Sequence, residues 1–249
     1  MIDNCNQSED LNRRIGGCTA FIRTHQKQDA ELAKAHSYRG QAYFDQGRYR
    51  SAIRDFDRVL ELVPESHNNY VRRAGALIKL KKYGDALADL LLATDLYPEF
   101  AENPRVLFRL LSAYNGLRDD EGLLATTDRA LALAVWNEDE VGLIWSGRAT
   151  ALVRLKQYEA SLAAFDNAVA AGFSEDWVFD YRGTVRCNLG DKAGALSDWT
   201  RAIAIGGPEK IRRTQEHLVK EGRFDGPADG SDSAAFRLAL EAHTVDHGC

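Results

Sequence analysis

The chain repeats itself with a period of 34 residues, and this period constrains the fold more than any other feature. The stretch "AHSYRGQAYFDQGRYRSAIRDFDRVLELVPE" (35–65) aligns with "NNYVRRAGALIKLKKYGDALADLLLATDLYPE" (68–99). Self-similarity at such a spacing is typical of a solenoid built from stacked supersecondary units. Positions 34 residues apart carry similar side chains: Gly40 and Ala74, Tyr43 and Leu77, Tyr49 and Tyr83, Ala52 and Ala86, Phe56 and Leu90, Pro64 and Pro98.

The residue types within one period predict a helical hairpin. Small residues at Gly40 and Ala52 allow two helices to approach closely, while Tyr43 and Phe56 fill the space between them. Pro64 ends the second helix, because proline has no N–H to donate and clashes with the preceding turn. The pattern resembles the tetratricopeptide repeat. This resemblance implies an all-α solenoid, a right-handed superhelix of helical hairpins.

The same period divides the chain. Five repeats are predicted at 33–66, 67–100, 104–137, 142–175 and 176–209, of which 104–137 is degenerate but in phase. Short insertions at 101–103 and 138–141 are expected to be loops. Residues 1–32 contain one amphipathic helix, about 9–25, which we expect to cap the first repeat. Residues 210–249 form a separate helical segment at the C-terminus.

Arginine and aspartate recur at fixed repeat positions. We expect ion pairs between the two helices of a hairpin rather than a row of ligand-binding arginines, because buried arginines are normally paired. The fourth repeat has Arg148 but Ala164 at the aspartate position, with Asp166 two residues later. The three complete pairs are Arg39 with Asp55, Arg73 with Asp89, and Arg182 with Asp198.

The first helix of each hairpin is expected to line a concave groove that holds a peptide or a partner helix. The second, fifth, ninth and twelfth repeat positions supply the candidates. In the first two repeats these are Lys34, Ser37, Gln41, Phe44, Asn68 and Val71. In the later repeats they are Arg105, Phe108, Ser112, Asn115, Thr150, Trp177, Asp180 and Thr184.

One known binding mode of this repeat family is not expected. Chaperone-binding members clamp a C-terminal carboxylate with Lys and Asn at the fifth and ninth positions. Those positions are Ser37 and Gln41 in the first repeat. Arg105 and Arg109 are at most a weak remnant of such a clamp.

The C-terminal stretch "IRRTQEHLVKEGRFDGPADGSDSAAFRLALEA" (211–242) interrupts the helical pattern with Asp-Gly steps. It resembles the first part of a peptidoglycan-binding-like domain, although "GSDS" replaces the family's Gly-x-Phe-Gly and a third helix is missing. Two interpretations stay open. The segment either caps the solenoid, or binds glycan with Phe224 as the stacking surface and Asp225 as the hydroxyl acceptor.

Two cysteines near the N-terminus are relevant to the cellular compartment of the protein. A Cys5–Cys18 disulfide is feasible only if the helix starts near Asp10, so that the chain can double back. The stretch "CNQSEDLNRRIGGCTAFI" (5–22) also resembles the N-termini of exported bacterial repeat proteins with paired cysteines, which implies the periplasm. The start "MIDNCNQSED" has no basic or apolar leader region, which favours the cytoplasm if Met1 is the native start.

Composition and motifs exclude several functions. The net charge is −5 and no Lys/Arg block is present, so neither nucleic acid nor an anionic membrane is an expected partner. The motifs HExxH, GxSxG, CxxC and the P-loop are missing, so we expect no enzyme. The tail places His243 and His247 four residues apart near Asp246 and Cys249, but a metal there would require a helix to 247. We expect a frayed tail, with no metal and no cofactor.

These observations predict a non-catalytic adaptor at the bacterial cell envelope. Its groove would hold a protein or peptide, and its C-terminal segment would act as a cap or weak anchor. The alternative is a carbohydrate-binding protein, in which the C-terminal segment binds peptidoglycan and the repeats only extend it.

Overall fold

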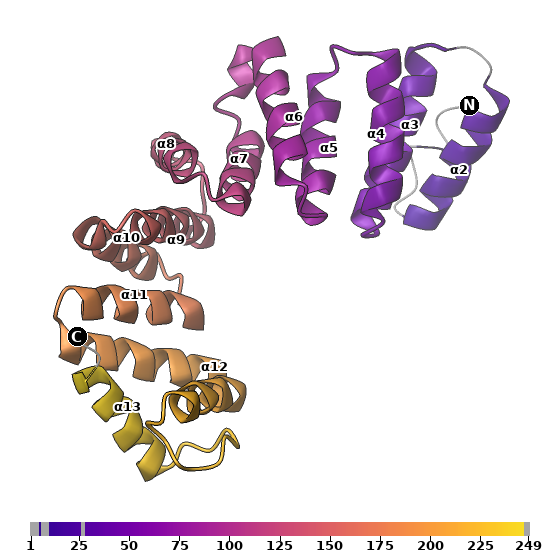
Figure 1. Cartoon of the computed structure of the whole chain (residues 1–249). Helices are drawn as coiled ribbons and strands as arrows, with labels where there is room; N and C mark the ends of the chain where they lie inside the picture. The colour runs from indigo at the N-terminus through magenta and orange to yellow at the C-terminus, as the bar shows by residue number, and fades with distance from the viewer. Residues whose placement is uncertain (1–4, 6–9, 26–27, 247–249) are drawn as a thin grey trace. The chain divides into compact units, whose positions relative to one another are not determined.

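The computed structural model describes residue 5 and residues 10–25 and 28–246, and within these ranges every regular element is helical (Figure 1). The first helices are α2 (Leu11–Thr24), α3 (Ala30–Asp45), α4 (Tyr49–Leu62), α5 (His67–Lys79), α6 (Tyr83–Leu96), η1 (Pro98–Phe100), α7 (Pro104–Leu117) and α8 (Asp120–Leu131). They are followed by α9 (Glu138–Arg154), α10 (Tyr158–Ala170), α11 (Asp176–Asn188), α12 (Lys192–Lys220) and α13 (Ala234–Asp246). This is the all-α architecture that the sequence predicts.

The chain divides into two compact units, Met1–Ala130 and Leu131–Cys249. In the first unit, each helix from α2 to α6 packs against the next helix in sequence, and α6 packs against α7. In the second unit, α9 packs on α10, α11 on α12, and α12 on α13. The division falls within the predicted third repeat. That repeat places a small polar residue, Thr127, where Phe56 and Phe165 fill other hairpins, and all three are fully buried.

Small and aromatic residues meet inside the hairpins as their spacing predicts. Phe56 is completely buried, and a Cβ at Gly40 would lie 2.8 Å from its ring. In the last hairpin, a Cβ at Gly183 would lie 2.7 Å from the ring nitrogen of Trp199. Glycine therefore permits the close approach of the two helices in both hairpins.

Residues 138–141, which were expected to be a loop, form the first turn of α9. The cause is a capping box, in which the Asn137 side chain accepts from the Glu140 N–H and the Glu140 side chain accepts from the Asn137 N–H. Near the end of the predicted fifth repeat, α12 is broken at Gly207, whose φ is 63°. Pro208 then begins the next helical segment, where its missing N–H costs nothing.

The three expected Arg–Asp pairs are confirmed, and each is bidentate. Arg39 donates to both Asp55 oxygens at 2.8 and 2.7 Å. Arg73 binds Asp89 and Arg182 binds Asp198 in the same way, at 2.6 to 2.9 Å.

A second row of aspartates joins consecutive hairpins. Asp57 on α4 accepts from Arg73 Nη1 at 2.7 Å, and Asp166 on α10 accepts from Arg182 Nη1 at 2.9 Å. Each of these two arginines therefore binds one carboxylate in its own hairpin and another in the preceding hairpin.

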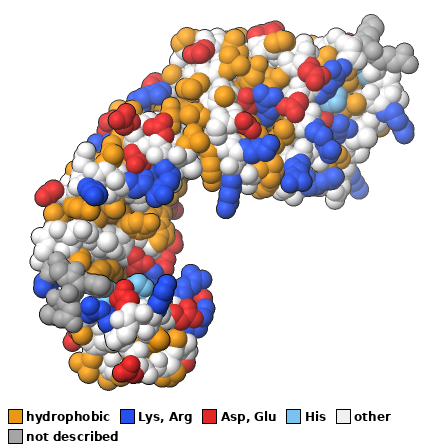
Figure 2. Space-filling model, viewed as in Figure 1, with side chains coloured by type: hydrophobic (Ala, Val, Ile, Leu, Met, Phe, Trp, Pro, Cys, Tyr) orange, Lys and Arg blue, Asp and Glu red, His pale blue; other side chains and the backbone are white. Residues whose placement is uncertain are grey.

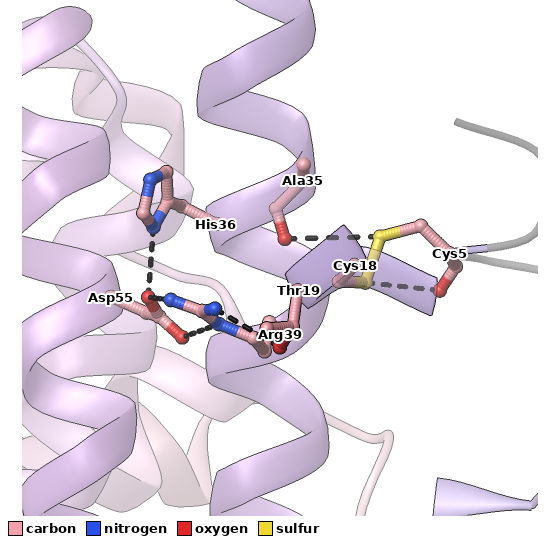
Figure 3. The surroundings of a disulfide bond; sticks show 7 residues. All are labelled: Cys5, Cys18, Thr19, Ala35, His36, Arg39 and Asp55. Carbon is pink, nitrogen blue, oxygen red and sulfur yellow. Dashed lines mark hydrogen bonds and ion pairs between the residues drawn. A yellow bond between two sulfur atoms is a disulfide. The ribbon is translucent and has the colours of Figure 1, made fainter. Parts of the chain in front are cut away.

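The N-terminal helix is tied to the first hairpin (Figure 3). Asp10 caps α2 by accepting from the N–H groups of residues 12 and 13, so the helix begins where the disulfide requires. Cys5 and Cys18 are bonded and fully buried against Ala35, with their Cα atoms 4.4 Å apart. Arg39 Nη1 also donates to Thr19 Oγ1 on α2 at 3.1 Å.

The buried pair predicts a large stability difference between two carboxylate deletions. Asp55→Ala leaves Arg39 and His36 without their buried carboxylate, and we expect it to cost about 3–5 kcal/mol. Glu61→Ala removes the exposed partner of Arg58 and should cost less than about 1 kcal/mol. Urea denaturation of both variants measures this, and equal losses would contradict the structural role of Asp55.

The same carboxylate predicts an acid dependence. Burial alone would raise the pKa of Asp55, but hydrogen bonds from Arg39 and His36 outweigh burial and lower it. Because the folded-state pKa is lower than the unfolded value of about 3.9, the stabilisation is complete above that pH. It is lost as the pH falls through the folded-state pKa. Thermal melts between pH 2 and 7 should show the advantage of wild type over Asp55→Asn shrinking below about pH 4.

Candidate functional site

The predicted groove residues of the first unit lie on the helices α3, α5 and α7, which contact one another in that order. Two of them, Ser37 and Val71, are buried, at 7% and 3% exposure, and cannot form a large contact with a ligand. The others are exposed or half-buried: Lys34, Gln41, Phe44, Asn68, Arg105, Phe108, Ser112 and Asn115.

Polar groups on this face are partly used for internal bonds. Ser37 Oγ donates to Asn69 Oδ1 at 2.7 Å and accepts from Arg72 Nη1 at 2.6 Å. Gln41 Nε2 donates to Asp45 at 2.8 Å. Ser37 therefore positions a neighbouring arginine, and is not itself a ligand-binding group.

Arg72 on α5 and Arg105 and Arg109 on α7 form a cluster, which we call the arginine site. A cavity of about 350 Å³ lies beside it, lined by Asn68, Val71, Arg72, Phe100, Asn103, Pro104 and Arg105. Figure 2 shows Lys and Arg side chains gathered along the lower edge of the first unit in this view. In a chain of net charge −5, this is a local concentration of positive charge.

Arg109 is the most enclosed member of the arginine site. Its guanidinium packs on Gly75, where a Cβ would lie only 2.8 Å from Arg109 Nε. Its Nη1 is buried and has no hydrogen-bond partner among the described residues. Burial, followed by the charges of Arg105 and Arg72, lowers the pKa of Arg109 to about 10. The guanidinium stays protonated at neutral pH, so the burial of this charge lowers the stability of the folded chain.

The other two arginines repel Arg109 as well as each other. Burial and then the charge of Arg105 lower the pKa of Arg72, while Tyr38 and Asp45 act weakly in the opposite direction. Within the described part of the chain, no ion pair of Arg72, Arg105 or Arg109 is found. A bound carboxylate would accept from several of these donors and relieve the repulsion.

The sequence prediction did not include Arg72, and it named Arg109 only as a weak remnant of a clamp. Both occupy the sixth position of their repeats, directly before the seventh position that holds the paired arginines. The predicted groove residues stand at positions two, five, nine and twelve, and the sixth position is not among them. The sequence signal for this row is two arginines without an aspartate at the spacing that the paired arginines use.

In the second unit the predicted groove residues form contacts within their own helix or with neighbouring segments. Thr150 Oγ1 donates to the Gly147 carbonyl at 2.8 Å, and Thr184 Oγ1 to the Asp180 carbonyl at 2.9 Å. The Asp180 carboxylate accepts from Lys210 Nζ. The Trp177 ring contacts the rings of Phe173 and Tyr181. No comparable cluster of cations is found among these four positions.

The C-terminal segment is a helical pair formed by the end of α12 and by α13, which pack against each other. Phe224, expected to be a stacking surface, is only 7% exposed and packs edge-on against Phe236. Gln215 is completely buried, accepts from the Gly230 N–H and donates to the Ser231 carbonyl, both at 2.9 Å. Asp225 is exposed. Phe224, expected to bind glycan, and Gln215 therefore hold the loop in place.

Comparison with known proteins agrees with the fold. The tetratricopeptide repeat family matches residues 33–66, the hairpin of α3 and α4. The chain is 36% identical over 109 residues to the Hsp70-Hsp90 organizing protein of Triticum aestivum, covering 44% of this chain and 18% of that protein. It is 35% identical over 75 residues to the STIP1 homolog of Dictyostelium discoideum, covering 30% of this chain and 13% of that protein. The chain thus matches less than a fifth of the length of either relative.

Solved structures share the architecture at low sequence identity. YrrB, described as a TPR protein with an unusual peptide-binding site, superposes with a TM-score of 0.61 at 18% identity, over 76% of this chain and 91% of that chain. MamA superposes with a TM-score of 0.61 at 14% identity, over 75% of this chain and 96% of the MamA chain. The fold is therefore an all-α tetratricopeptide-repeat solenoid. Proteins of this class mediate protein–protein interactions and are generally non-enzymatic. None of the described helices is long and apolar enough to cross a membrane.

The unpaired charge of Arg109 predicts an unusual stability effect. Arg109→Met keeps the packing against Gly75 and removes a buried cation, so we expect the free energy of unfolding to rise by about 1 kcal/mol. The matched control is Arg73→Met, which leaves Asp89 and Asp57 without their guanidinium and should cost about 3 kcal/mol or more. Urea denaturation distinguishes the two, and a destabilised Arg109→Met would contradict the uncompensated charge.

Proposed function

We propose that this protein is a non-catalytic scaffold that binds an acidic peptide segment of a partner protein at the arginine site. One observation carries the proposal. Three arginines converge from α5 and α7 with no ion pair among the described residues, and a buried nitrogen of Arg109 lacks a hydrogen-bond partner. Folded proteins rarely keep such groups unless a ligand satisfies them.

The chemistry favours carboxylates on an extended peptide. A guanidinium presents a planar fork of donors that matches a carboxylate, and burial strengthens that interaction. Phe100 and Pro104 lie on the wall of the same cavity and offer apolar contact to a side chain between the acidic residues. The cavity of about 350 Å³ is large enough for one or two side chains, so most of the peptide would lie along the helix face.

This mode differs from the carboxylate clamp of chaperone-binding repeats. Ser37 and Gln41 stand at the clamp positions, and both are bonded internally. The name of the Triticum aestivum relative associates that protein with Hsp70 and Hsp90. The recognition we propose uses Arg72 and Arg109 at the sixth repeat position, together with Arg105 at the second.

The disulfide supports an oxidising compartment, because such bonds rarely persist in the cytosol. We therefore extend the proposal to an exported protein that works at the bacterial cell envelope. Glycan binding by the C-terminal segment is not part of the proposal. The ring of Phe224 is buried against Phe236, and only Asp225 of the expected pair is exposed.

The test is a peptide titration of the full chain followed by fluorescence anisotropy. The probe is a labelled 12-residue peptide in which Glu and Asp alternate with Ala and Leu, and its control carries Gln and Asn instead. We expect binding of the acidic peptide only, weakened by high salt. Arg72→Gln, Arg105→Gln and Arg109→Gln should each weaken binding about tenfold, since each removes a charge-assisted bond worth about 1.5 kcal/mol.

The matched control is Arg54→Gln, an exposed arginine on α4 of the same unit whose Nη2 donates to Ser51 Oγ. It should bind the acidic peptide as well as the wild type does. Equal binding of the amide peptide, or an equal loss in Arg54→Gln, would contradict the proposal. A version of the acidic peptide with an amidated C-terminus shows whether the terminal carboxylate contributes.

A further inference from the structure

A second cluster of chemically active side chains lies in the second unit, far in sequence from the arginine site. His217 lies in the last turn of α12, Glu221 is the residue that follows the end of this helix, and His243 lies on α13. His217 Nε2 is 3.1 Å from Glu221 Oε1, and His243 Nδ1 is 3.2 Å from Glu221 Oε2. One ligand atom from each residue lies within 4.8 Å of the others. We propose that these three residues bind a divalent transition-metal ion, with zinc as the first choice.

The distances are close to those of a metal-bound arrangement. Zinc lies about 2.0–2.1 Å from imidazole nitrogen and carboxylate oxygen, so neighbouring ligand atoms of a tetrahedral site are about 3.3 Å apart. The two measured separations of 3.1 and 3.2 Å are close to this value, and they join the two imidazoles to different oxygens of the Glu221 carboxylate. Rotation of the solvent-exposed His217 side chain can bring the remaining separation into range.

The donor set selects the class of ion. Two imidazoles and one carboxylate suit zinc, nickel and copper, whereas calcium and magnesium prefer oxygen ligands alone. Three protein ligands leave a fourth position for water or another ligand. His217 and His243 also line a cavity of about 390 Å³, so this position can open into it.

Nearby positive charge limits the affinity but does not block the site. Arg223 Nε lies 3.7 Å from Glu221 Oε2 and competes with the metal for that carboxylate. Lys210 is bound to Asp180, and Arg213 donates to Glu209 at 3.0 Å, so both charges are partly neutralised. Arg223 is thus the cation whose removal should strengthen metal binding.

The fold holds the two helices in position before any metal binds. Gln215 bridges to Gly230 and Ser231 in the loop that connects α12 to α13. Leu218 and Leu240 belong to the apolar core between these helices and line the same cavity. A metal at this point would join α12 to α13. The sequence analysis pairs His243 with His247, which lies outside the described residues. His217 lies 26 positions before His243, and no local sequence pattern links the two.

The experiment uses the full chain, purified without a histidine tag and treated with a chelator. Zinc is titrated by calorimetry, and we expect one equivalent to bind. His217→Ala, Glu221→Gln and His243→Gln should each weaken binding at least tenfold, because each removes a ligand. The matched control is Glu216→Gln, an exposed carboxylate on the same helix that bonds to Arg212. Arg223→Gln should tighten binding several-fold.

Nickel provides a local readout. The Trp199 ring centroid lies 6.0 Å from that of His243, so nickel at this site should quench Trp199 fluorescence, and Trp199→Phe should lose most of that quenching. Zinc should also raise the melting temperature of the wild type but not that of Glu221→Gln. Zinc affinity within twofold of wild type in both His217→Ala and Glu221→Gln would overturn the proposal. Loss of binding in His247→Ala with Glu221→Gln unaffected would overturn it as well.

Discussion

The buried bidentate pair between arginine and aspartate is the interaction on which the repeat architecture depends. Arg39 with Asp55, Arg73 with Asp89, and Arg182 with Asp198 each fix one helix of a hairpin against the other at the same two positions. Asp57 and Asp166 extend the pairing to the next hairpin. Such a pair gives geometric specificity more than net stability, since both charges lose their water. Apolar packing around Phe56, Leu90 and Phe165 supplies the stabilisation.

Adjacent positions of one helix carry arginines with opposite roles. Arg73 satisfies two carboxylates, and its neighbour Arg72 turns about 100° around the helix toward Ser37 and the arginine site. Arg109 occupies the same sixth repeat position on α7. Its guanidinium packs against Gly75, which has no side chain, and no acidic side chain among the described residues pairs with it. The same residue type therefore orders the scaffold in one row, and in the next row it places a positive charge that no acidic side chain among the described residues neutralises.

The sequence predicts the structural features that recur with the 34-residue period. It does not predict contacts between residues that are far apart in the chain. The hairpins, the paired arginines and the buried glycine–aromatic contacts follow from residue types 34 positions apart, and the structure contains them. The capping box of Asn137 and Glu140 is a local sequence signal for the start of α9, although residues 138–141 were expected to be a loop. Phe224 suggested a ligand surface, but its partner Phe236 lies on another helix and buries it. His217 and His243 also come together only in the folded chain, because the loop between α12 and α13 does not follow the repeat period.

The most direct measurement is the NMR titration of arginine Nε–Hε signals in the full chain with the acidic 12-residue peptide. We expect the signals of Arg72, Arg105 and Arg109 to shift together with one saturation curve. The signal of Arg73, which is one residue away but already bound to Asp89 and Asp57, should stay in place. Shifts spread over exposed arginines throughout the chain, with the three signals unmoved, would contradict the proposed binding site.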